Sequence, residues 1–317
     1  MVSKYRFIYT RLATVLPTAF ISLTIIFFLL EIVPGDTADV LLGPGANQQD
    51  IEFLRKMLGL DLPPHERYLD FLVNVVKGDF GISLATSRSV NKLIMEALPV
   101  TLTLAVSSML IALLIGIPSG IISAIKRNTR TDLFVSFGAL VGISVPGFWL
   151  GMLMLLFFAV YLKVLPGAGF VNPFLDPIEG IKHLIMPSLM LGLILAGFIS
   201  RITRSSLIEV MLQDYILTAR AKGLPERIII YKHALKNALI PVVTVVGFQF
   251  GALLGGAVIA ETIFTMSGIG KLIYSGIIDR DFPVVEGVAI TMVLTFILIN
   301  LVVDLVYMYL DPRVRLG

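Results

Sequence analysis

The chain has 317 residues, of which 56% are hydrophobic and only 15% are charged, and its mean hydropathy is +0.91. This exceeds what the core of a water-soluble domain can bury, so the composition predicts an integral membrane protein. Cysteine is absent, which excludes disulfides, thiolate metal sites and cysteine nucleophiles. The net charge of +3 is small, and we expect no nucleic-acid partner.

Six stretches are long enough to cross a bilayer, which takes about 20 apolar residues in a helix. Basic residues precede the first, but its apolar run is too long for a signal-peptide core, so we expect it to remain as a helix. The predicted fold is an all-α, polytopic membrane protein. The predicted spans are 12–33, 98–125, 133–162, 184–200, 238–260 and 283–310.

Lysine and arginine indicate the orientation of these spans. They gather in residues 4–11, 126–130, 201–236 and 313–315, whereas the two short loops on the opposite side hold only Lys163, Lys182, Lys271 and Arg280. The positive-inside rule therefore predicts that both termini and the loop 201–237 are cytoplasmic. This gives an N-terminal segment with the first span (1–33), an extracytoplasmic subdomain (34–97) and a core of five spans (98–317).

The extracytoplasmic subdomain contains two helical patterns. "NQQDIEFLRKMLGL" has apolar residues at helical spacing, and "HERYLDFLVNVVKGDFG" repeats the pattern and stops at glycine. The subdomain is either a cap over the membrane bundle or a docking platform for an extracytoplasmic partner, and the pattern does not separate the two.

Motifs for catalysis, metal or cofactor binding are not found. "TMSGIGKLI" departs from a phosphate-binding loop at Thr265 and Leu272, and the three histidines are scattered. No histidine pair, aspartate pair or serine with a base has the arrangement of a membrane protease. Glu286 and Asp304 are ionisable residues of the last span, for which a structural hydrogen-bonding role is favoured over a proton relay.

Glycine and proline occur at several positions within the predicted spans. Gly247, Gly251 and Gly255 recur every four residues, as Gly116 and Gly120 do, and this spacing predicts surfaces on which helix backbones pack closely or line a pathway. Interrupted membrane helices need a neighbour or a cavity to satisfy the freed carbonyl groups. The interrupting prolines are Pro17, Pro118, Pro146, Pro187 and Pro241.

The stretch "DYILTARAKGLPERIIIYKHALKNALIP" is a basic, polar island between apolar runs. We expect a helix that continues from the fourth span, ends at Gly223 and restarts at Pro225, forming a compact knob beneath the membrane. Such a knob either contacts anionic lipid or fits a groove on a partner protein.

These residues resemble the inner-membrane permease subunits of ABC importers of the dipeptide, oligopeptide and nickel type. The resemblance covers essentially the whole chain, through "IVPGD", "LGLD", "GDFGIS", "TRSS", "DYILTARAKGL", "HALKNALIPVVT", "ETIF", "GIGKL", "RDFPVV", "NLVVDLVY" and "DPRVR". Where the general importer motif has Glu-Ala-Ala, this chain has Leu217, Thr218 and Ala219 before Gly223, and Pro241 lies farther from that glycine than in the general pattern.

The resemblance implies an importer subunit, without enzymatic activity of its own, in a bacterial inner membrane. Its loop 201–237 would couple to two ATPase subunits that bind ATP and Mg²⁺, beside a second permease, membrane lipid and a substrate-binding protein. Peptides, a nickel chelate and glutathione remain alternative substrates, and a passive channel or scaffold is the alternative class. The implied coupling residues are Asp214, Thr218, Ala219, Arg220, Ala221, Lys222, Gly223 and Leu224. Gly268 and Gly270, in an expected outer loop, are docking candidates for the binding protein.

Overall fold

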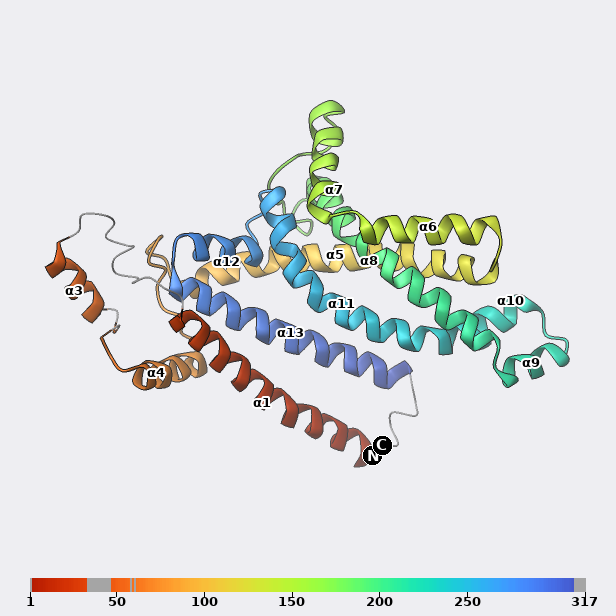
Figure 1. The fold of residues 1–317 in the computed structure, drawn as a ribbon, viewed down its shortest axis with the longest axis horizontal. Helices are drawn as coiled ribbons and strands as arrows, with labels where there is room; N and C mark the ends of the chain where they lie inside the picture. Colours follow the sequence, from red (N-terminus) through yellow and green to blue (C-terminus); the bar gives the residue numbers. More distant parts are fainter. Residues whose placement is uncertain (1, 33–46, 58, 60, 311–317) are drawn as a thin grey trace. The chain divides into compact units, whose positions relative to one another are not determined.

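The computed structural model describes residues 2–32, 47–57, 59 and 61–310 (Figure 1). These residues form two compact units: unit 1 contains 2–8, 100–266 and 298–310, and unit 2 contains 9–32, 47–57, 59, 61–99 and 267–297. Over the described ranges the chain is helical, with one isolated β-bridge between Ile82 and Ser89 and no strand. The all-α prediction is therefore confirmed.

The elements follow the apolar runs of the sequence and extend beyond them. α8 begins at Pro177, a turn and more before its apolar run, because the Asp176 side chain accepts from the Glu179 backbone N–H and caps the helix. The α-helices are α1 Val2–Ile32, α3 Gln48–Met57, α4 Pro64–Lys77, α5 Val90–Ile125, α6 Arg130–Ser144, α7 Gly147–Met154, α8 Pro177–Met211, α9 Asp214–Ala221, α10 Glu226–Ile228, α11 Leu235–Ile263, α12 Ile269–Ile278 and α13 Phe282–Leu310. The π-helices are η1 Leu155–Tyr161 and η2 Ile229–Ala234.

Four described helical stretches are long and apolar enough to span a membrane: Val90–Ile125, Pro177–Met211, Glu226–Ile263 and Phe282–Val303. α6 and the α7–η1 stretch meet at 97°, the geometry of either a broken fifth span or a re-entrant loop. Val145 there is extended, with φ −72° and ψ 124°, as expected for a residue before proline. The first predicted span lies in α1, where Leu16–Leu29 is apolar.

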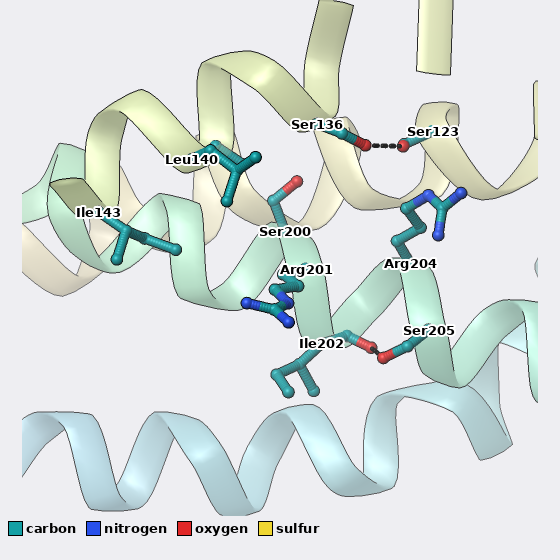
Figure 2. Close-up of a pocket in the computed structure, with 10 residues that line it drawn as sticks. Ser123, Ser136, Leu140, Ile143, Ser200, Arg201, Ile202, Arg204 and Ser205 are labelled. Carbon is teal, nitrogen blue, oxygen red and sulfur yellow. Dashed lines mark hydrogen bonds between the residues drawn. The ribbon is translucent and has the colours of Figure 1, made fainter. Parts of the chain in front are cut away.

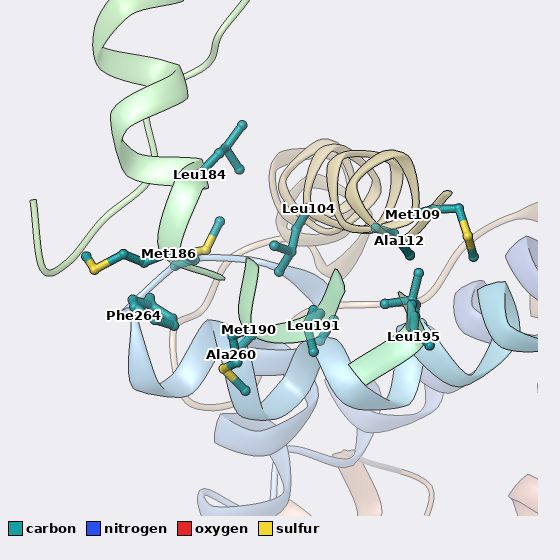
Figure 3. Packing of buried hydrophobic residues seen from close by; sticks show 14 of the residues in the cluster. Leu104, Met109, Ala112, Leu184, Met186, Met190, Leu191, Leu195, Ala260 and Phe264 are labelled. Carbon is teal, nitrogen blue, oxygen red and sulfur yellow. The ribbon is translucent and has the colours of Figure 1, made fainter. Parts of the chain in front are cut away.

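Unit 1 is organised around α8, which packs against α6 and α11. Its core joins α5, α8 and α11, as Figure 3 shows for Leu104, Met190 and Ala260. The three side chains are 0%, 1% and 0% exposed. The interior of this unit is therefore a dry, close-packed apolar cluster.

Glycines allow α8 to approach its neighbours closely. A methyl group on Gly120 of α5 would lie 2.6 Å from the Ser200 carbonyl oxygen, and one on Gly197 of α8 would lie 2.6 Å from the Ala139 carbonyl oxygen. Backbone atoms cannot turn aside as a flexible side chain does. The predicted close packing along Gly116 and Gly120 is thus confirmed, with α8 as the partner helix.

Unit 2 contains the two helices predicted from the pattern of the extracytoplasmic subdomain, α3 and α4. α4 ends at Gly78, whose φ of +69° is the left-handed conformation that glycine adopts readily. Phe27 of α1 and Phe71 of α4 pack with their ring centroids 5.4 Å apart, and the Tyr68 hydroxyl lies 2.7 Å from the Thr24 hydroxyl. α1 and α4 are thereby joined by aromatic and polar contacts.

Candidate functional site

The basic island folds as a separate short helix beneath α8. α8 ends at Met211, Gln213 is extended with φ −77° and ψ 150°, and α9 begins at Asp214. The expectation of one continuous helix to Gly223 is therefore wrong. After the break, Ile216 of α9 is fully buried and belongs to the same apolar cluster as Leu207 of α8.

α9 is fixed by a buried base and by a hydrogen bond. Ile216 and Ala219 belong to an apolar cluster with residues of α5, α8, η2 and α11. The Asn237 side-chain amide donates to the Tyr215 hydroxyl over 2.8 Å, which ties α9 to α11. α9 is thus held against α8 by apolar packing and against α11 by packing and a hydrogen bond.

The turn after α9 has the geometry that its glycine predicted. Gly223 has φ +74°, its N–H donates to the Arg220 carbonyl, and the Leu224 N–H donates to the Ala219 carbonyl. These two bonds form a Schellman motif, which satisfies carbonyl groups at the helix end. α10 then starts at Glu226, one residue after the predicted restart at Pro225.

An ion pair closes the same turn. The Arg220 guanidinium donates to the Glu226 carboxylate, and this partner raises the pKa of Arg220. Ala219 is buried, whereas the other coupling residues are exposed, namely Asp214, Thr218, Arg220, Ala221, Lys222, Gly223 and Leu224. The structure therefore brings the predicted coupling residues together on one helix and its turn.

Exposed apolar side chains lie on and beside α9, and the sequence analysis did not assign them to the coupling residues. Leu217 is 52% exposed, Tyr231 is 59% exposed and Leu212 is 69% exposed. Large apolar residues in a polar, solvent-facing segment are typical of a protein-binding surface. Leu217 and Tyr231 lie inside the basic island and Leu212 lies two residues before it, so the sequence contained this signal.

A second feature missed from the sequence fixes α8 to the start of α6. Nε and Nη2 of Arg204 donate to the two carboxylate oxygens of Asp132, each over 2.8 Å. Asp132 also accepts from the Ser123 hydroxyl and the Asn128 backbone N–H, and it is 4% exposed. Figure 2 shows Arg204 on α8 close to Ser123 and Ser136. This bidentate pair braces the end of α8 that leads into α9.

Two acidic residues of the motifs after the fifth span are buried. In unit 1, Glu261 is 0% exposed and accepts from the Thr101 hydroxyl. In unit 2, Asp281 is 2% exposed and accepts from the Ser83 hydroxyl and from the backbone N–H groups of residues 84 and 85. Each carboxylate therefore links two segments of its own unit that are far apart in the sequence.

The three glycines of the strip predicted on α11 lie in different environments. A methyl group on Gly247 would collide with the Val303 side chain, Gly251 is half-buried, and Gly255 is exposed with no atom within 4 Å of the added carbon. Gly247 therefore faces a neighbouring helix, whereas Gly255 faces outward. Packing and pathway roles for the strip stay predictions.

The remaining candidates lie in unit 2 or outside the described side chains. The segment expected as an outer loop contains α12, and Gly268 and Gly270 are buried at the start of this helix. Their docking role stays a prediction. Glu286 lines a cavity of about 590 Å³ that Arg67 also lines. The side chain of Asp304 lies outside the described residues.

Comparison with known proteins identifies the family. The family described as "Binding-protein-dependent transport system inner membrane component" matches residues 116–316, which include α9 and its turn, and the N-terminal part of such components matches residues 4–105. The chain belongs to this family. It is a permease subunit of an ABC importer, located in the inner membrane.

Relatives of this permease match over nearly their whole length. It is 42% identical to the dipeptide transport system permease protein DppB of Alkalihalophilus pseudofirmus, over 96% of this chain and 98% of that protein. It is 40% identical to the glutathione transport system permease protein GsiC of Escherichia coli, over 98% of each.

The fold also matches a solved transporter. An inward-facing structure of the MetNI methionine ABC transporter covers 69% of this permease and 96% of its own chain, with a TM-score of 0.58 and 22% identity. At this identity the likeness concerns the fold alone, and it supports the ABC importer permease architecture.

Proposed function

We propose that this permease forms half of the translocation pathway of an ATP-driven importer for di- or oligopeptides or a related small solute such as glutathione. The observation that carries the proposal is α9, a short helix seated on a buried apolar base with an exposed rim. A helix of this kind fits a groove on an ATPase subunit. The dipeptide and glutathione transport named for the relatives support the substrate class.

The proposed complex contains further subunits for ATP hydrolysis, for the second half of the pathway and for delivery of the solute. Two ATPase subunits bind ATP and Mg²⁺, a second permease completes the pathway, and an extracytoplasmic protein delivers the solute. With both termini and the loop 201–237 in the cytoplasm, α9 faces the ATPases. Closure of the ATPases would displace α9, and the contacts of Ile216 and Tyr215 would pass this movement to α8 and α11.

The turn at Gly223 provides the test of coupling. Gly223→Val forces a β-branched residue into a left-handed conformation that costs roughly 1–2 kcal/mol, and Arg220→Glu replaces the ion pair with Glu226 by repulsion. Both variants should insert normally but lose most of the ATPase association and transport. The matched control is Gly138→Val, because an added carbon at Gly138 of α6 meets no atom within 4 Å.

The measurement combines purification with uptake. The tagged permease is purified from native membranes, co-purifying ATPases are identified by mass spectrometry, and uptake of labelled dipeptide and labelled glutathione is measured in vesicles. Full association and full uptake in both turn variants would refute the coupling role. Uptake that continues without ATP would instead indicate a passive channel, and uptake of neither solute would refute the substrate class.

A further inference from the structure

A cavity of about 640 Å³ lies in unit 1, bordered by α5, α6 and α8 (Figure 2). None of its lining residues belongs to α9 or to the turn that follows. The lining divides into an apolar part and a polar part. The apolar residues are Ala139, Leu140, Ile143 and Ile202, and the polar residues are Ser123, Ser136, Ser200, Arg201, Arg204 and Ser205.

Arg201 lies at the end of the apolar run of α8, and the apolar lining residues of α6 lie deeper. Arg201 directly follows the apolar run 184–200 of α8, about 26 Å along the helix from Leu184, so its long side chain can reach the surface of the roughly 30 Å hydrocarbon layer. Ile143 is level with Gly197, one turn back towards the membrane centre, since a methyl group on Gly197 would lie 2.8 Å from Ile143 Cγ1. The cavity therefore runs from the cytoplasmic surface, in the proposed orientation, into the apolar layer.

Arg201 carries the uncompensated charge at this surface. Nε and Nη2 of Arg204 are both bound to Asp132, so its charge is already matched. The Arg201 side chain is exposed, and its guanidinium makes no hydrogen bond or ion pair with any residue in the described part of the chain. A free guanidinium at the mouth of an apolar cavity favours an anionic ligand with an apolar body.

A buried hydroxyl adds a specific polar contact. Ser200 is 4% exposed, lines the cavity and accepts a hydrogen bond from Ser119 over 2.9 Å. The Ser119 hydroxyl also lies 3.0 Å from the Gly116 carbonyl oxygen, and its single proton can serve only one of these two oxygens. Ser200 thus adds a hydroxyl group to the cavity wall, next to Arg201 in the sequence.

We propose that this cavity holds one phospholipid with an anionic headgroup. Its phosphate binds Arg201 and the Ser200 hydroxyl, and part of an acyl chain packs along Ala139, Leu140 and Ile143. Basic pockets between membrane helices on the cytoplasmic side are suited to acidic headgroups. The bound lipid contacts α8 beside the Asp132–Arg204 pair and so steadies the helix that leads into α9.

Native mass spectrometry of the purified full-length permease tests the proposal, with phosphatidylglycerol and phosphatidylcholine as probes. We expect retained phosphatidylglycerol in excess of phosphatidylcholine, and a roughly fivefold weaker affinity for phosphatidylglycerol in Arg201→Gln. Ala139→Phe fills the apolar part and should lower retention of phosphatidylglycerol without removing a charge. The control Arg227→Gln removes an exposed charge from α10, away from the cavity, and should bind as the unmodified chain does.

Four results would overturn the proposal. Equal retention of the two lipids, or equal loss in Arg201→Gln and Arg227→Gln, would mean that any lipid bound is unspecific. Unchanged retention in Ala139→Phe would remove the acyl chain from the cavity. Displacement of the lipid by excess inorganic phosphate would indicate a site for a free anion. No ATPase is needed for this measurement, so its outcome is independent of the proposed transport function.

Discussion

The ion pair between Asp132 and Arg204 predicts that its two members are unequal in their effect on stability. The Asp132 side chain is 6% exposed, whereas that of Arg204 is 30% exposed. Arg204→Met therefore leaves a buried carboxylate without a counter-charge, and removing one partner of a buried pair costs about 3–5 kcal/mol. Asp132→Asn leaves an arginine that water can reach, so we expect a smaller cost of about 1–2 kcal/mol.

The free energy of unfolding of the purified permease, from an SDS titration followed by circular dichroism, measures both effects. The double variant Asp132→Asn/Arg204→Met should cost less than the sum of the single variants by about 1–3 kcal/mol, since the two groups interact directly. Arg227→Met is the control, expected within about 0.5 kcal/mol of the unmodified chain. Additive costs, or a larger loss in Asp132→Asn than in Arg204→Met, would refute the reasoning.

Further predictions concern glycines. Gly120→Ala should lower the free energy of unfolding by about 1–3 kcal/mol because its methyl group meets the α8 backbone, whereas Gly138→Ala, in open space, should not; equal values would contradict the packing described for α5. Gly247→Leu should destabilise the permease, whereas Gly255→Leu should leave the isolated chain stable; lost transport in the second variant alone would assign Gly255 to a subunit interface or the pathway. Gly270→Val should reduce binding-protein-stimulated ATP hydrolysis of the complex more than basal hydrolysis, and equal reductions would argue for packing instead.

Hydropathy located the spans because lipid and protein interior both demand apolar side chains, but it did not determine their continuity. Helices continue through Pro187 and Pro241, yet the chain bends at Pro146. Each of these prolines removes one backbone donor. The presence of proline alone therefore does not show whether a helix continues or bends there. Pro187 is buried among the tightly packed residues of α8, whereas the residue before Pro146 is extended.

The coupling turn and its anchor differ in how far the sequence reveals them. Gly223 was predictable, since few other residues adopt φ +74° without strain. The break at Gln213 was not, because it has neither glycine nor proline and results from the burial of Ile216. The bond between Asp132 and Arg204 joins residues 72 positions apart, which no local spacing indicates.

The π-helical turn η2 gives this permease a place to absorb a change in chain length. Each N–H in such a turn bonds to the carbonyl five residues back, as the Leu235 N–H does to Ile230, so the turn contains one residue more than an α-helical turn. η2 lies between Gly223 and Pro241, the two positions whose separation exceeds that of the general importer motif. A family member with one residue fewer here would form an ordinary α-helical turn and keep both flanking helices in place. Deleting one residue from η2 should therefore leave α9 in its seat.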